Sequence, residues 1–104
     1  MLSGPMEILE LKSGEPFLFR VTEWQRDEAI IRPARAPMGI AVDVLRLHVP
    51  AADKPLPPHY WDLTAKTAIF QLLPHLQRPD FKNRTFTLTA RGDGPAKRFE
   101  LEVK

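Results

Sequence analysis

Hydrophobic and polar residues alternate along residues 17–24, 84–91 and 97–104, and a period of two residues predicts half-buried β-strands. Two further strands are predicted over residues 28–35, where prolines end the strand, and over residues 40–49, which makes five in all. In the first segment, Phe17, Phe19 and Val21 share the face expected to point into the core, and Trp24 falls on the opposite face. A turn is expected at 25–27, between the first two strands.

The third segment departs from strict alternation. Ile40, Val42 and Val44 lie on one face, and then Leu45 and Leu47 take over the apolar role from the other. A phase slip of one residue inside a long strand predicts a β-bulge near Val44, and bulges bend strands toward barrel closure.

The last two segments flank a glycine-containing turn at 92–96, which predicts a hairpin. Their inward-facing residues are expected to be Phe86, Leu88, Ala90, Phe99, Leu101 and Val103.

A single helix is predicted over residues 63–76, where apolar residues follow helical spacing. Asp62 or Thr64 is expected to cap its first turn, and Pro74 to end or kink its last. The preceding connector, 50–60, contains four prolines and is expected to be extended. Before the first strand, residues 1–15 are expected to form a tail, or a short edge strand over 6–12.

The fold class that follows is all-β with one helix, in the order β-β-β-α-β-β. That order resembles the five-stranded OB-fold barrel, so the chain is expected to form a single OB-like domain over residues 1–104. In such a barrel the helix lies between the third and fourth strands and covers one open end.

A family resemblance covers residues 60–103. The helix YWDLTAKTAIFQLL followed by FKNRTFTLTARGDGPAKRFELEV resembles the C-terminal half of small phage and plasmid single-stranded-DNA-binding OB proteins. In that class a tryptophan precedes the helix, and the last strand closes the barrel after a glycine-containing turn. The resemblance implies binding of single-stranded nucleic acid with little sequence choice, in DNA replication or recombination.

The composition of the chain excludes several kinds of chemistry. The chain has 104 residues and no cysteine, which removes disulfides, thiolate nucleophiles and cysteine-based zinc sites. No segment reads as a membrane span or a signal peptide, so a cytoplasmic protein is expected. Neither the two serines nor the three histidines have catalytic or metal-ligand spacing, so no enzyme activity, metal or cofactor is expected.

Cations and one aromatic residue gather on the predicted outer faces. Single strands are held by aromatic rings that stack on bases and by cations that contact phosphates. The predicted nucleic-acid-binding residues are Arg20, Trp24, Arg32, Arg35, Arg46, His48, Arg91, Lys97 and Arg98. Trp24 either stacks on a base or caps an edge of the core.

Three functions stay open at this point. The first is a single-stranded-DNA-binding protein, with RNA not excluded. The second is a protein–protein interaction module or small subunit of a larger assembly, and the third is the detached regulatory domain of an enzyme. The net charge of +2 permits a polyanionic partner without requiring one, and homo-oligomerisation is left open.

Overall fold

The computed structural model describes residues 4–32, 34, 36–92 and 97–104. Its elements within these residues are β1 (Pro16–Phe19), β2 (Glu23–Ile31), β3 (Ile40–His48), β4 (Tyr60–Leu63), α1 (Lys66–Leu76), a 3₁₀ turn (Phe81–Asn83), β5 (Phe86–Arg91) and β6 (Arg98–Val103). The expected class, mostly β with one helix, is confirmed. No helix in this part of the chain is long and apolar enough to cross a membrane.

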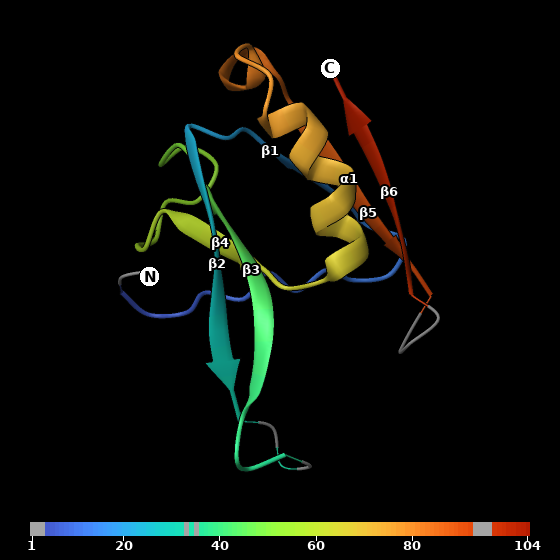
Figure 1. Ribbon diagram of the computed structural model, residues 1–104. Coiled ribbons are helices and arrows are strands. Elements are labelled where there is room, and N and C mark those ends of the chain that lie inside the picture. Colours follow the sequence, from blue (N-terminus) through green and yellow to red (C-terminus); the bar gives the residue numbers. More distant parts are fainter. Residues whose placement is uncertain (1–3, 33, 35, 93–96) are drawn as a thin grey trace.

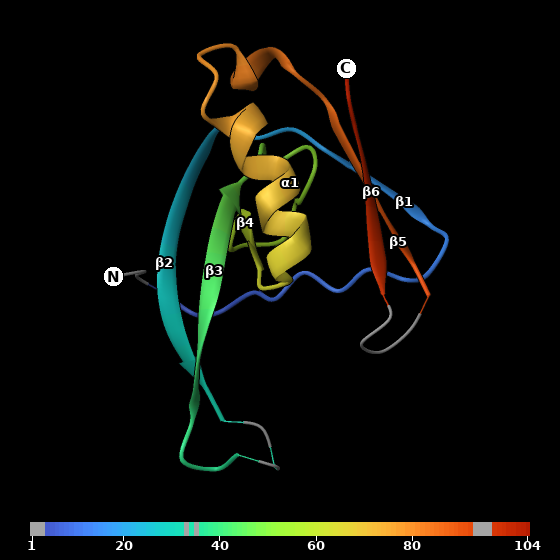
Figure 2. The same ribbon diagram turned by 45° about the vertical axis from the view of Figure 1, so that its right-hand side comes forward.

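The strands form two antiparallel sheets of three. One has the order β2-β3-β4 and the other β1-β5-β6. Helix α1 lies between the two sheets, and the β2–β3 ribbon extends beyond it (Figures 1 and 2). The hairpin predicted from the last two segments is confirmed as β5–β6. The described residues form six strands in two sheets and no closed barrel, so the predicted five-stranded OB-like barrel is not confirmed.

The first predicted strand is two strands. Residues 20–22 form a bend, after which the chain leaves the β1 sheet and enters the β2 sheet. Phe19 and Val21 are buried as expected, but the alternation does not continue across the bend to Trp24. The turn predicted at 25–27 is also wrong, because these residues lie in the middle of the nine-residue strand β2.

Strand β3 contains no bulge. Its pairing with β2 runs without interruption from Ile31↔Ile40 to Glu23↔His48. Val44 and Leu45 lie on opposite faces, yet both are fully buried. The apparent phase slip therefore has another cause. This part of β3 is covered on both faces, so apolar residues occur at positions of both faces and the alternation is lost.

Helix α1 begins later than predicted. Leu63, the first residue of the predicted helix, is instead the last residue of β4, and Asp62 is buried in that strand. The N-cap is Ala65, without a side-chain cap. The helix ends at Leu76, as predicted, with Pro74 in its last turn.

The core lies between the helix and the two sheets. Five helix residues (Ala68, Ile69, Leu72, Leu73 and Leu76) are buried against Phe19, Phe86 and Leu88. Inward-facing Phe99, Leu101 and Val103 pack against this cluster as predicted. The N-terminal edge strand is reduced to a single parallel bridge between Ile8 and Asp62, extended by a hydrogen bond from the Leu9 N–H to the Asp62 carbonyl.

Candidate nucleic-acid interface

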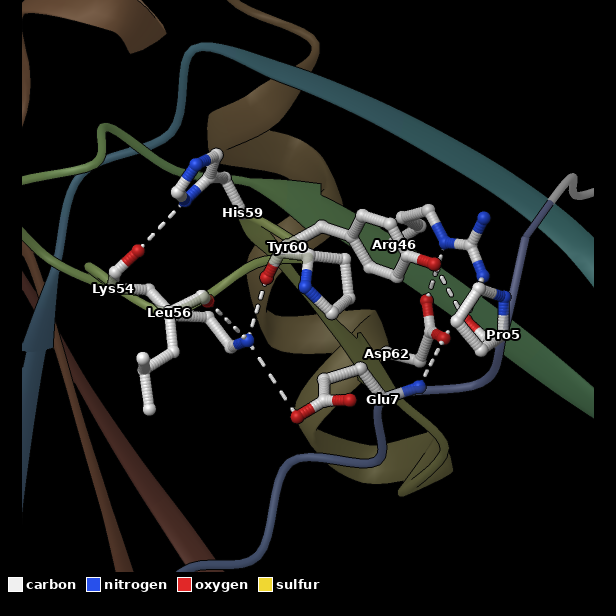
Figure 3. A network of polar contacts seen from close by, with 9 residues as sticks. Pro5, Glu7, Arg46, Lys54, Leu56, His59, Tyr60 and Asp62 are labelled. Carbon is white, nitrogen blue, oxygen red and sulfur yellow. Dashed lines mark hydrogen bonds and ion pairs between the residues drawn. The ribbon is translucent and has the colours of Figure 1, made fainter.

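Arg46 lies in a buried ion pair and not on an outer surface. Its Nε donates to Asp62 Oδ1 at 2.7 Å and its Nη2 to Asp62 Oδ2 at 3.0 Å. The two side chains are 2% and 0% exposed, and the guanidinium lies 3.9 Å from the centre of the Tyr60 ring (Figure 3). The hydrogen bonds to Asp62 raise the pKa of Arg46, so the buried group stays charged. The prediction that Arg46 faces outward is wrong.

The N-terminal segment holds this ion pair against the sheet. The Glu7 N–H donates to Asp62 Oδ2 at 2.9 Å, and the Pro5 carbonyl accepts from both Arg46 Nη2 and Tyr60 Oη (Figure 3). The segment that contains Pro5 and Glu7 therefore covers the β3–β4 surface on which the sequence placed a phosphate-binding arginine. A buried, bidentate pair with satisfied hydrogen bonds is a structural feature, because a ligand could reach it only after this segment had moved.

The neighbouring cations are also engaged. Lys54 Nζ donates to the carbonyls of Leu56 and Pro58 and lies 3.5 Å from a Glu7 carboxylate oxygen. His48 is half-buried, with its ring edge toward Tyr60, and its buried Nε2 has no hydrogen-bond partner among the described residues. His48 therefore lies on the covered face and does not present a cation to solvent.

Trp24 packs against the core, contrary to its predicted outward position. Its indole Nε1 donates to the Leu76 carbonyl at 3.1 Å, at the end of α1. In the β2–β3 register it pairs with the buried Leu47, and paired residues share a face. The ring still lines a shallow hollow of about 320 Å³ beside Phe81 and Lys82.

The remaining predicted cations are exposed but dispersed. Arg20 pairs with Asp53 at 3.3 Å, and Arg91 lies 3.5 Å from Glu100. Arg98 faces Arg91 across the β5–β6 ladder, and Arg32 is exposed where β2 ends. Arg35, the other arginine predicted in that loop, is outside the described residues. The structure does not gather these side chains into one cluster.

Two hollows that the sequence did not indicate lie at the start of α1. Their volumes are about 390 and 360 Å³, and Thr64 lines both of them. The larger hollow is lined by Leu9, Glu10, Leu11, Leu63, Thr64, Ala65, Lys97 and Phe99, and the smaller by Glu28, Ala41, Val42, Asp43, Thr64 and Lys66. We call these two hollows together the α1 groove.

The α1 groove carries one lysine in each hollow. None of the ion pairs among the described residues involves Lys66 or Lys97. Of the predicted site residues, Lys97 alone lines the groove. Lys66, the first residue of α1, was not among the predicted site residues, because nothing in the local sequence distinguishes it from any other exposed helix lysine.

Among the residues that the structure describes, no group of three or more histidine, aspartate or glutamate side chains could hold a metal ion. No protein-family model, curated protein or solved structure shows a significant match to the chain. The sequence resemblance to single-stranded-DNA-binding OB proteins therefore stays a prediction.

Proposed function

We propose that this chain binds single-stranded nucleic acid, with DNA as the first candidate, along the α1 groove. The observation that carries the proposal is the position of the groove. Its smaller hollow lies at the β2–β3 ribbon, through Ala41 and Asp43, and its larger hollow lies at the start of β6, through Lys97 and Phe99. OB-fold proteins bind oligonucleotides between the corresponding two loops.

The order of strand pairing supports an OB-like interpretation. If β1 and β2 are counted as one strand bent at residues 20–22, the pairing order becomes β4-β3-(β2/β1)-β5-β6. Along the chain, α1 then lies between β4, the third strand, and β5, the fourth. A five-stranded, partly open barrel with a long bent first strand would have this order. On this basis we propose that the chain has an OB-like fold.

The lining chemistry fits a phosphate backbone and a base. Lys66 and Lys97 provide cations at the two ends, and the half-buried Phe99 provides a ring. Glu10, Glu28 and Asp43 line the same groove, and these carboxylates oppose phosphate binding. We therefore expect modest affinity that depends strongly on salt.

Removing both lysines tests the groove directly. Fluorescence anisotropy with labelled oligo(dT) should give a log–log salt dependence of about −0.7 per phosphate neutralised. Lys66→Ala/Lys97→Ala should weaken binding at low salt and flatten this slope by roughly 0.7 for each lysine, since each loses one phosphate contact. Single-stranded RNA and duplex DNA of the same length establish which nucleic acid is preferred.

A matched control removes two lysines elsewhere. Lys82→Ala/Lys104→Ala changes the net charge equally, but Lys82 lies beside the Trp24 hollow and Lys104 at the chain end. This variant should retain the wild-type slope. A larger loss in the control would move the interface to the Trp24 hollow, and the absence of any salt-dependent binding would favour the protein–protein interaction module.

A further inference from the structure

We propose that two copies of this chain associate by antiparallel pairing of their β2 strands, which joins their sheets into one of six strands. Strand β2 forms one edge of the sheet β2-β3-β4 (Figures 1 and 2). The opposite edge, β4, already receives the chain's own residues 7–9. An edge strand of nine residues presents a row of backbone donors and acceptors to a partner strand.

Symmetry limits the registers that two copies can adopt. In a symmetric antiparallel pair, the two-fold axis perpendicular to the sheet lies midway between the two copies of one residue. It cannot lie between neighbouring positions, because each residue would then pair with its neighbour in sequence, whose side chain points to the other face. Strand β2 runs from Glu23 to Ile31, so an axis at Asp27 is the one register that pairs all nine residues. Moving the axis to Arg26 or to Glu28 would leave residues at one end of the strand unpaired and shorten the ladder.

The Asp27 register brings complementary side chains together on the helix-covered face. Arg26 of each copy lies opposite Glu28 of the other, which forms two symmetry-related pairs of opposite charge. Trp24 lies opposite Ile30, an apolar side chain that is 57% exposed in the single chain. Charge complementarity and the covering of Ile30 both favour a second copy as the occupant of this edge.

Two features at the axis oppose the association. Asp27 lies opposite its own copy, and like charges in directly opposed positions are destabilising. Asp27 Oδ1 also accepts from the Glu28 N–H at 2.8 Å, so this backbone donor must exchange partners before it can join a ladder between two copies. Charged residues on edge strands also serve in many proteins to prevent pairing of this kind. We therefore infer a reversible association that depends on concentration, which does not require nucleic acid.

Charge reversal tests the register by sedimentation velocity over a range of protein concentrations. Arg26→Glu and Glu28→Arg should each weaken association by about tenfold, since both symmetry-related pairs become repulsive together. The double variant Arg26→Glu/Glu28→Arg should restore it, because opposite charges again face each other. Circular dichroism confirms folding of each variant, since Arg26 also lies 3.9 Å from Asp43 and over the Phe70 ring.

Strand β6 offers a matched control with the same charge spacing. Arg98→Glu and Glu100→Arg reverse an exposed arginine and an exposed glutamate two residues apart on the edge of the other sheet. These variants should leave association unchanged. A chain that stays monomeric at every concentration, a double variant that fails to recover, or an equal effect of the β6 variants would overturn the proposal.

A cysteine at the axis gives an independent measurement. The chain contains no cysteine, so Asp27→Cys introduces a single thiol. Directly opposed antiparallel residues have Cα atoms about 4.5–5.5 Å apart, within the range that a disulfide spans. With oxidised glutathione as the oxidant, Asp27→Cys should form a covalent dimer and Glu102→Cys on β6 should not. Equal cross-linking of both variants would contradict the β2 register.

Discussion

Replacement of Asp62 by alanine is expected to lower the free energy of unfolding by about 3–5 kcal/mol, as for other buried ion pairs that lose one partner. The substitution leaves the Arg46 guanidinium, 2% exposed, without its counter-charge. It also removes the acceptor of the Glu7 N–H, which fastens the N-terminal segment to β4. Urea denaturation followed by circular dichroism measures the loss.

Two further variants separate the ion pair from general effects of substitution. Glu100→Ala removes an exposed carboxylate 3.5 Å from Arg91 and should cost no more than about 1 kcal/mol. Arg46→Met/Asp62→Leu should be less destabilising than Asp62→Ala, because it leaves no unpaired charge in the interior. If Asp62→Ala costs as little as Glu100→Ala, then Arg46 reaches water and the outer-face prediction from the sequence would be restored.

The sequence indicated the elements better than it indicated their connections. Strict alternation in residues 84–91 and 97–104 predicted the β5–β6 hairpin, because each strand has one covered face and one polar face. The same rule failed in β3, where the N-terminal segment covers the second face over Arg46. A buried arginine and an exposed arginine look alike in a pattern of charged and apolar positions, and only the partner, Asp62, distinguishes them.

The candidate site was less predictable for a related reason. The α1 groove depends on where the helix begins and on how the two sheets diverge, and neither is encoded in local periodicity. Asp62 and Thr64 both have N-cap chemistry, yet the chain remains extended through Leu63 because β4 pairs with β3. Tertiary pairing thus overrides a local capping preference, and it makes Lys66 the first residue of the helix.

Trp24→Ala is expected to lower the free energy of unfolding by about 2–3 kcal/mol. This is below the ~3–5 kcal/mol typical of a fully buried tryptophan, since the ring is only partly buried. The loss combines reduced packing against the core with removal of the hydrogen bond from indole Nε1 to the Leu76 carbonyl. Trp24→Phe should recover part of the packing and none of the hydrogen bond, so its cost should lie between those of wild type and Trp24→Ala.

Binding measurements on the same variant decide whether the ring also contacts a base. Phe70→Ala is the control for loss of an aromatic side chain, since Phe70 is 56% exposed and its removal should change stability by about 0.5 kcal/mol or less. Trp24 does not line the α1 groove, so folded Trp24→Ala should bind oligo(dT) with wild-type affinity. A stacked base is worth ~1–3 kcal/mol, so stable Trp24→Ala protein with about tenfold weaker binding would place the interface at the hollow beside Phe81 and Lys82. In that case the aromatic residue would act as the sequence suggested, from a different strand and on a different face.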